Sequence, residues 1–321
     1  MKSLSRREWL ELTGLSAIAM SRFAAAATSR TQPGCTLGFS TYGMKTLPIE
    51  EAIATIADIG FDSIELTAHT DWDAAPPKMP PERRKAVRAQ LADSGLVLTS
   101  LMEHIYPAAD DAQHAKDLDR LKAVVQLGHD LSPSDIPLVQ TVLGGGTWEE
   151  KRDLFRDRLG DWVNVCKEGR ATLAIKPHRG GAMSKPSEAA WLIQQLDHTR
   201  WLRIVYDYSH YAFRDMSIEQ TVKDALPHTF HIAVKDAYQD CDRVAFALPC
   251  ERGTIDFVKI LRLFYEGGYR GDVSCEVSGM VSGKEGYDPK AAVKTCYENM
   301  APVLEKAGVP RRSQKPGTAE P

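Results

Sequence analysis

ATLAIKPHRGGAMSKPSEAAWLIQQLDHTRWLRIVYD, residues 171–207, contains two short apolar runs separated by a helical pattern. The runs ATLAIK (171–176) and LRIVYD (202–207) have the length and apolar content of buried strands. Between them Pro186 suits the first turn of a helix, and apolar residues recur at helical spacing over 189–196. The stretch therefore predicts one strand–helix–strand unit.

The same alternation runs along most of the chain. Further strand-like runs are CTLGFST (35–41), FDSIEL (61–66), LVLTSL (96–101), IPLVQTVL (136–143), TFHIAVK (229–235) and GDVSCEV (271–277). Eight strands alternating with eight helices predict an α/β fold, a single (β/α)8 TIM barrel over residues 28–305. A doubly wound open sheet is the alternative, but FSTYGMK (39–45) lacks the glycine-rich fingerprint usual after its first strand.

The two ends of the chain are predicted to lie outside the barrel. Residues 1–27 contain Arg6 and Arg7, then a modestly apolar stretch, then an alanine run, an order typical of a twin-arginine export signal. We therefore expect an exported, periplasmic protein; an ordinary basic N-terminus is the alternative. The polar residues 306–321 are expected to form a disordered tail.

Composition narrows the classes of partner. The 321-residue chain has a formal net charge of −3 and no long basic run outside its termini. This charge balance argues against nucleic acid or a membrane surface as partner. The N-terminal apolar stretch is too short to predict stable membrane insertion. The oligomeric state is left open, a homo-oligomer included.

Six cysteines occur in the chain. Cys35, Cys275 and Cys296 fall in predicted strands or helices, where buried free thiols are common. Cys241 and Cys250 flank the run DRVAFALP within one predicted loop. In an oxidising compartment these two are the pair predicted to form a disulfide.

Titratable side chains gather at the predicted carboxyl ends of six strands, the end where barrels of this kind carry their function. Side chains at i and i+2 share a face of a strand, so each end presents a small group of them. The candidates are Glu65, His69, His104, Lys176, His178, Asp207, His210, His231, Lys235 and Glu276. Together they predict a polar pocket capable of acid–base chemistry, with His231 interpreted as a hydrogen-bonded core histidine.

Several motifs resemble the xylose-isomerase-like barrel superfamily over about residues 35–305. They are IKPH (175–178), DYSH (207–210), VKDA (234–237), GTIDF (253–257) and GYRGDVSCEVSG (268–279). The resemblance implies a small carbohydrate or polyol as substrate. It also implies a divalent metal (Mn, Mg or Zn) held by Glu, Asp, His and Glu at the ends of strands five to eight. The Asp and the last Glu fall on Asp207 and Glu276, whereas the other two positions are Lys176 and Ala233.

Lys176 is predicted to supply the positive charge that the metal supplies in relatives. Its ammonium group would bridge Asp207 and Glu276 and aim remaining donors at a sugar oxygen. A structural salt bridge and an imine nucleophile are the alternatives, although two carboxylates favour the charged amine over the neutral one an imine needs. A retained metal on Asp207, Glu276, His210 and His178 is a further alternative; no cofactor is the expectation.

The residues at the carboxyl ends of the predicted strands are assigned two roles. Acid–base chemistry beside a carbonyl is assigned to Lys176, His178, His210, Glu276 and Glu65. Substrate binding is assigned to His69, His104, Tyr208 and Lys235. The aromatic residues expected on or near rim loops are Tyr42, Trp72, Tyr208, Tyr211 and Phe246, and residues 236–253 are expected to form a lid or a subunit contact.

The sequence thus favours a sugar isomerase or epimerase that works through an enediol-like intermediate. A dehydratase or other lyase of the same superfamily is one alternative. A non-catalytic sugar-binding barrel is another, since two metal ligands are missing. DNA repair is not expected, because the endonuclease relatives need several zinc ligands and a basic groove.

Overall fold

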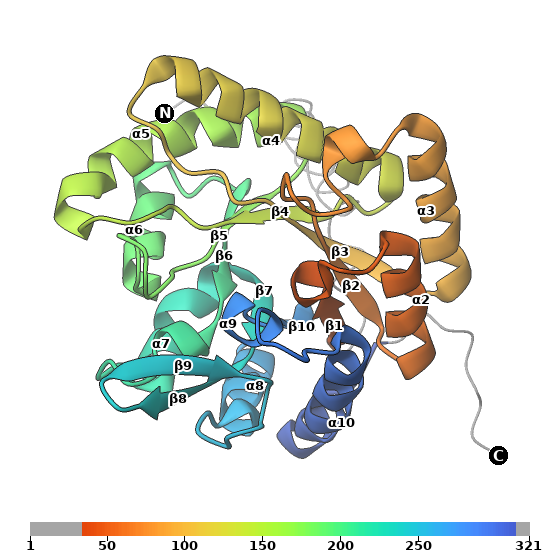
Figure 1. Cartoon of the computed structure of the whole chain (residues 1–321). Helices are drawn as coiled ribbons and strands as arrows, with labels where there is room; N and C mark the ends of the chain where they lie inside the picture. Colours follow the sequence, from red (N-terminus) through yellow and green to blue (C-terminus); the bar gives the residue numbers. More distant parts are fainter. Residues whose placement is uncertain (1–33, 313–321) are drawn as a thin grey trace, which may run out of the picture.

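The computed structural model describes residues 34–312. Eight parallel strands close into a barrel in the order β1-β10-β7-β6-β5-β4-β3-β2, and helices surround them (Figure 1). The barrel strands are β1 (Thr36–Ser40), β2 (Ser63–Thr67), β3 (Val97–Met102), β4 (Leu138–Thr141), β5 (Leu173–Ile175), β6 (Leu202–Tyr206), β7 (Thr229–Val234) and β10 (Asp272–Cys275). The predicted TIM barrel and all eight predicted strands are confirmed.

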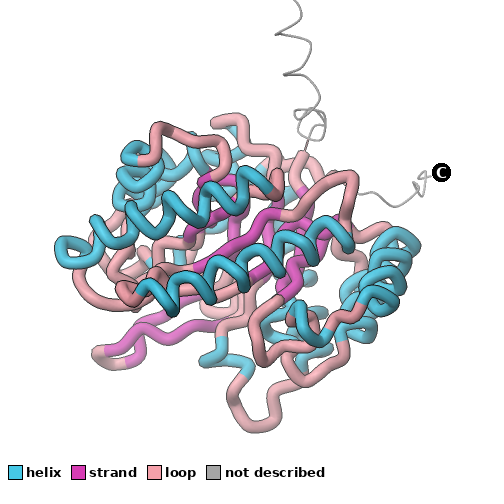
Figure 2. The backbone as a smooth tube through the Cα atoms, turned by 90° about the horizontal axis from the view of Figure 1, so that it is seen from above, coloured by secondary structure: helices cyan, strands magenta, loops and turns pink. Residues whose placement is uncertain are grey.

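Helices fill the connections between consecutive barrel strands and form the outer layer (Figure 2). They are α2 (Ile49–Ile59), α3 (Pro81–Ser94), α4 (Asp111–Leu131), α5 (Trp148–Glu168), α6 (Pro186–Gln195), α7 (Ile218–Ala225), α8 (Phe257–Glu266) and α10 (Pro289–Ala307), with a short α9 (Gly279–Ser282). Short 3-10 helices are η1 (Thr41–Met44), η2 (Pro76–Lys78), η3 (Tyr208–His210) and η4 (Leu226–His228). None of these helices is both long and apolar enough to span a membrane.

Helix boundaries follow local signals in most places. Gly60 ends α2 with φ of 110°, a conformation that glycine adopts without the penalty other residues pay, and its N–H bonds Ala57 O at 3.2 Å. Gly128, which resembles such a stop signal, lies inside α4 instead, because its backbone packs against Pro137 and Leu101.

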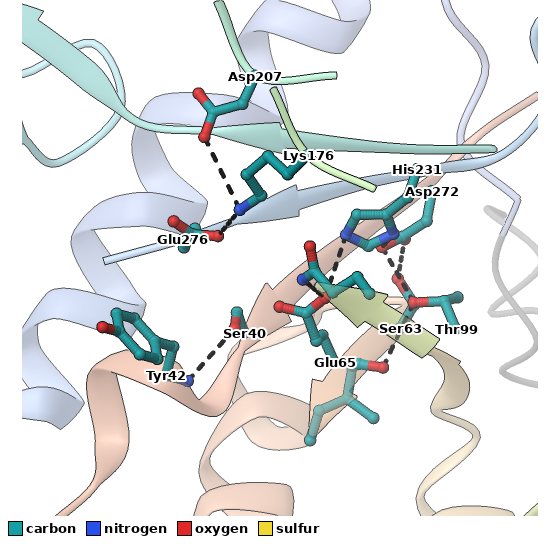
Figure 3. A network of polar contacts seen from close by, with 12 residues as sticks. Ser40, Tyr42, Ser63, Glu65, Thr99, Lys176, Asp207, His231, Asp272 and Glu276 are labelled. Atoms are coloured by element: carbon teal, nitrogen blue, oxygen red, sulfur yellow. Dashed lines mark hydrogen bonds and ion pairs between the residues drawn. The ribbon is translucent and has the colours of Figure 1, made fainter. Parts of the chain in front are cut away.

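The core has an apolar shell and a polar interior. The apolar faces of α5, α6 and α8 are buried against the strands. Inside the barrel, Asp272 accepts hydrogen bonds from Thr36 Oγ1 at 2.6 Å and Thr99 Oγ1 at 3.1 Å, and also from Ser63. These buried polar groups are called the lower network below, and the carboxyl end of the barrel is called the mouth. Figure 3 shows the lower network beneath the charged groups of the mouth. A buried carboxylate is tolerated here because its oxygens have partners.

Residues 236–253, expected to form one loop, contain an antiparallel hairpin of β8 (Asp236–Asp240) and β9 (Arg243–Ala247). Cys241 lies at its tip and Cys250 beyond its base, and both are free thiols. β9 is five residues long, about 17 Å at 3.3 Å per residue. A disulfide needs Cα atoms within about 7 Å, so the predicted pairing is wrong.

The C-terminal boundary differs from the expected one. α10 continues to Ala307, and the next residues pack beside the first strand: Cys35 N donates to Pro310 O at 2.9 Å, and Arg312 N donates to Cys35 O at 2.9 Å. Arg311 forms two bonds with the buried Asp62, at 2.8 and 2.9 Å. The expected disorder is therefore wrong for residues 306–312. The predicted signal and residues 313–321 lie outside the described range.

Candidate active site

Four charged side chains meet at the carboxyl end of the barrel. Lys176 follows β5, Asp207 follows β6, Lys235 follows β7 and Glu276 follows β10. Each exposes 6% of its surface or less. Figure 3 shows Lys176, Asp207 and Glu276 pointing toward one another. These four residues are called the charge cluster below.

Lys235 bridges the two carboxylates of the charge cluster. Its Nζ donates to Asp207 Oδ2, and to Glu276 Oε1 over 2.7 Å. Lys176 Nζ donates to Glu276 Oε2 but lies 4.0 Å from Asp207 Oδ2, beyond hydrogen-bonding distance. The bridge expected of Lys176 is therefore made by Lys235. Of the three N–H donors of each ammonium group, Lys235 uses two and Lys176 uses one, so Lys176 has more donors left for a ligand.

Electrostatics keep Glu276 and Lys235 ionised. Burial alone would raise the pKa of Glu276, but the ammonium groups of Lys176 and Lys235 outweigh burial and hold this pKa below its ordinary value. Burial would likewise lower the pKa of Lys235, yet Asp207 and Glu276 outweigh it and raise this pKa. The mouth therefore carries the fixed positive charge of Lys235 beside the ionised carboxylate of Glu276.

The DYSH motif folds back on itself to place two groups of the site. Asp207 begins the 3-10 helix η3, and its Oδ1 accepts from Ser209 Oγ at 2.6 Å and from Ser209 N at 3.2 Å. The turn returns His210 toward the same carboxylate, with Nε2 3.4 Å from Asp207 Oδ2. His210 is 1% exposed, and burial followed by the charge of Lys235 lowers its pKa well below the ordinary value.

His178 lies beside His210, with ring centroids 4.0 Å apart. Burial, followed by the charges of Lys235 and Lys176, lowers the pKa of His178 to about 4, so the ring is neutral at pH 7. Gly180 N donates to His178 Nδ1 at 3.1 Å. Because Nδ1 accepts this bond, the neutral ring carries its proton on Nε2. His178 is therefore a hydrogen-bond donor at neutral pH rather than a base.

Aromatic rings form an arc along the mouth on the β1–β3 side. Tyr42 stacks on Trp72 with centroids 5.3 Å apart, and His104 lies 6.0 Å from Tyr42 and 5.2 Å from His69. Tyr106 follows at 6.5 Å from His104. Burial, followed by His69 and then Lys176, lowers the pKa of His104 to about 4, which places its ring near the charge cluster. Such an arc offers flat aromatic faces to a ligand.

Three buried polar atoms of the mouth lack a protein partner. His69 Nδ1, Trp72 Nε1 and His210 Nδ1 have no hydrogen bond within residues 34–312. A buried polar atom without a partner is destabilising, so native proteins pair such atoms with protein, water or ligand. These three atoms are available to hydrogen-bond a ligand or water at the mouth.

Two residues assigned to the site lie elsewhere. Glu65 is 1% exposed inside the barrel, bonded to Gln140 and 3.5 Å from His231 Nε2, so it belongs to the lower network. Tyr208 donates its hydroxyl to Met216 O at 2.9 Å, which directs the side chain away from the mouth. His231 is buried in the core as predicted and lies 3.5 Å from both Glu65 and Asp272, but neither of its ring nitrogens forms the predicted hydrogen bond within residues 34–312.

Sequence reasoning missed two contributors to this region. The bridging role of Lys235 follows from its face, shared with His231 and Ala233 by strand alternation, but only the folded barrel shows that it reaches both carboxylates. Tyr106 stands two residues beyond His104, and the same alternation would have suggested it.

The charge cluster does not fit a divalent metal. Lys235 Nζ occupies the space between Asp207 and Glu276, and an ammonium group there repels a cation. Within residues 34–312 no group of three or more His, Cys, Asp or Glu side chains is arranged to hold a metal ion. Zinc, magnesium and calcium sites in proteins require more oxygen, nitrogen or sulfur ligands than two carboxylates provide. The alternative ligand set with His210 and His178 is not formed.

Comparison with protein families gives one match, to the xylose isomerase-like TIM barrel, over residues 53–295. The curated proteins contain no match to this sequence.

Several solved structures share the fold. D-psicose 3-epimerase, determined in the presence of D-fructose, is 13% identical over 85% of this chain and 99% of its own, with a TM-score of 0.70. The zinc-bound IolI protein is 16% identical over 85% of this chain and 99% of its own, with a TM-score of 0.70. YcjR from E. coli, a 3-keto-D-glucoside 4-epimerase, is 15% identical over 84% of this chain and 98% of its own, with a TM-score of 0.64. At these identities the likeness concerns the fold alone.

Proposed function

Because the chain belongs to the xylose isomerase-like TIM barrel family, we propose that it is a sugar isomerase or epimerase that moves a proton beside a carbonyl group. Neighbours of the same fold include a D-psicose 3-epimerase and an L-ribulose 3-epimerase, which supports a small carbohydrate as substrate. The observation that carries the proposal is the charge cluster, in which Lys176 donates to Glu276 and keeps donors free at the mouth.

Lys176 acts on the oxygen of the reacting carbonyl. Removing a proton from the neighbouring carbon leaves negative charge on that oxygen, as an enediolate. An ammonium group held in place beforehand stabilises this charge without reorganisation, and in a water-poor site the effect is larger than in bulk water. Lys235 is a positioning residue. It is buried and donates to both Asp207 and Glu276, and it thereby holds the Glu276 carboxylate in place for Lys176.

Proton transfer uses groups that remain unprotonated at neutral pH. Glu276 is ionised and adjoins Lys176, and His104 is neutral and faces the same charges. His178 donates from Nε2 and can hydrogen-bond a substrate hydroxyl or carbonyl. A base and a separate hydrogen-bond donor at one mouth allow a proton to leave one position of the substrate and return at another.

Solvent deuterium exchange tests this proposal without knowledge of the product. The protein is incubated with a panel of aldoses and ketoses in D2O, and proton NMR follows loss of the signal beside the carbonyl. We expect exchange with at least one sugar, and a fall of about 100-fold or more in Lys176→Met, as for loss of one oxyanion donor. Exchange at the parental rate in Lys176→Met contradicts the role of Lys176.

Lys235→Met serves as the matched variant. It removes the bridging cation and leaves Asp207 facing Glu276, so we expect a loss of folding stability of about 3–5 kcal/mol. Urea denaturation of both variants measures the difference. Equal stability of Lys235→Met and Lys176→Met would contradict the separate roles assigned to the two lysines.

One feature favours a non-catalytic sugar-binding barrel as second candidate. Both carboxylate oxygens of Glu276 accept from ammonium groups, and its lowered pKa makes it a weak base. Calorimetric binding of a sugar with no deuterium exchange across the panel would establish this second function and exclude the first.

A further inference from the structure

A cavity of about 460 Å³ adjoins the mouth between the ends of β4 and β5. It is called the second cavity below, to distinguish it from the space over the charge cluster. Its lining includes Tyr106, Gly144, Gly145, Lys151 and His178. Small-molecule sites usually measure about 300–1,000 Å³, so this space is large enough to hold part of a ligand. None of the charge cluster lines it, and it therefore offers a site additional to the reacting centre.

His178 joins the two spaces. Its ring is tilted against that of His210, whose Nε2 lies 3.4 Å from Asp207 Oδ2. His178 also lines the second cavity. On the other side the aromatic arc leads from Tyr42 through His104 to Tyr106. A ligand that lies over the charge cluster can thus extend into the second cavity, with His178 on one side of it and the aromatic arc on the other.

The cavity walls are held in place. Ala182 N donates to Gly144 O at 2.8 Å and so joins the loop after β5 to the loop after β4. His178 N donates to Met183 O at 3.0 Å within the loop after β5. Gly144 has φ of 84°, and a Cβ there would approach the Tyr106 ring to 3.3 Å. Glycine at this position lets the ring lie against the loop.

The lining suits a neutral sugar ring. Tyr106 is 50% exposed, an unusual state for a large aromatic side chain, and its face can pack on the C–H face of a pyranose. Lys151 lines the cavity, and its ammonium group can donate hydrogen bonds to hydroxyl groups. The cavity thus combines one flat apolar wall with polar donors, the combination that sugars require.

We propose that the substrate is a glycoside, whose reacting sugar lies over Lys176 and Glu276 while a second ring occupies the cavity beside Tyr106. This inference rests on the proposed function, because it assigns a larger substrate to the same reacting centre. It predicts that linked sugars bind better than the corresponding single sugars.

Matched pairs of sugars test the inference. Binding of D-glucose and cellobiose, and of D-galactose and lactose, is measured by calorimetry, and deuterium exchange is followed with the 3-keto forms of each. We expect at least a tenfold preference for one disaccharide over its single sugar. Tyr106→Ala should reduce that preference tenfold or more, because it weakens binding of the disaccharide more than binding of the single sugar, and Tyr106→Phe should retain it.

Two further variants sharpen the test. Gly145→Leu adds a side chain where a Cβ would meet only Gly180 O at 3.8 Å, so it should fit the backbone, narrow the cavity and remove the preference. Phe213→Ala removes a comparably exposed ring, 49% exposed, that does not line the cavity, and should change nothing.

The outcomes separate this inference from the proposed function. Equal handling of single and linked sugars, unchanged by Tyr106→Ala, overturns the glycoside inference and leaves the isomerase proposal standing. A preference lost in Lys151→Met and at high salt, but kept in Tyr106→Ala, assigns the cavity to an anionic group and also overturns it. Absence of exchange with every sugar, linked or single, overturns the proposed function itself.

Discussion

Protonation at the mouth is controlled by burial and by two lysines. His104 and His178 each have a pKa of about 4, and that of the fully buried His210 is also lowered. Burial is the largest cause in all three. Neutral imidazoles can lie beside two ammonium groups without charge repulsion, which explains how so many basic groups share one rim.

These shifts make folding stability depend on pH. Between pH 6.5 and about 4, the unfolded chain binds protons on His104 and His178 that the folded protein does not bind. Stability therefore falls as pH decreases through this range, by about 1.4 kcal/mol per pH unit for each histidine. Glu103 opposes this trend, because burial raises its pKa to about 7.

Comparison of variants isolates the histidine contribution. We expect urea denaturation to show a smaller loss of stability from pH 7 to pH 5 in His178→Gln and in His104→Gln than in the parent protein. A loss as large as that of the parent in both variants would contradict the lowered pKa values. The folded state would then tolerate the charged ring.

At the residue scale, sequence reasoning located the site but not its contacts. Strand alternation placed Lys176, Asp207 and Glu276 at one end of the barrel, where they meet. It could not decide which lysine bridges the carboxylates, because that depends on how far each side chain reaches across a closed barrel. It also placed Glu65 at the mouth, since alternation gives the face of a residue and not its depth.

The β8–β9 hairpin is the element that covers the Lys235 side of the mouth. Phe246 of β9 lies with its ring centroid 5.4 Å from Lys235 Nζ and 5.3 Å from the His210 ring. Asp236 ties the hairpin base: it accepts from Thr254 Oγ1 at 2.6 Å, and from Arg252 N and Gly253 N at 2.9 Å each.

Asp236→Ala should release this element. Loss of the carboxylate removes three hydrogen bonds that hold residues 252–254 to the base of the hairpin, each contributing about 0.5–1.5 kcal/mol. We expect faster hydrogen exchange over residues 236–254, measured by mass spectrometry, with barrel strands unchanged. Asp240→Ala, at the exposed hairpin tip, is the control. Uniformly faster exchange across the barrel would show that Asp236 stabilises the whole fold instead.

Among the elements, barrel strands were predictable and the hairpin was not. Barrel strands are buried on both faces, so they appear as continuous apolar runs such as LRIVYD. β8 reads DAYQD and is paired only with β9, so its sequence resembles that of a loop. The antiparallel pairing of β8 with β9 across a short turn distinguishes this strand from a loop, and that pairing is seen only in the folded structure.

For the whole molecule, we propose export by the twin-arginine route, which carries proteins that are already folded. Replacing Arg6 and Arg7 together by lysine should retain the protein in the cytoplasm. Cell fractionation with immunoblotting measures this distribution, and Arg22→Lys is the control. An undiminished periplasmic fraction in the double variant would contradict this route.

The pairing of Cys35 with residues 310–312 has a consequence for chain connectivity. Both ends of the described chain meet at the amino face of the barrel, opposite the mouth. A short peptide joining them would let the gene be circularly permuted, with new ends opened at the hairpin tip near Cys241. The same arrangement allows the protein to be tethered to a surface through either end, with its candidate active site directed toward solution.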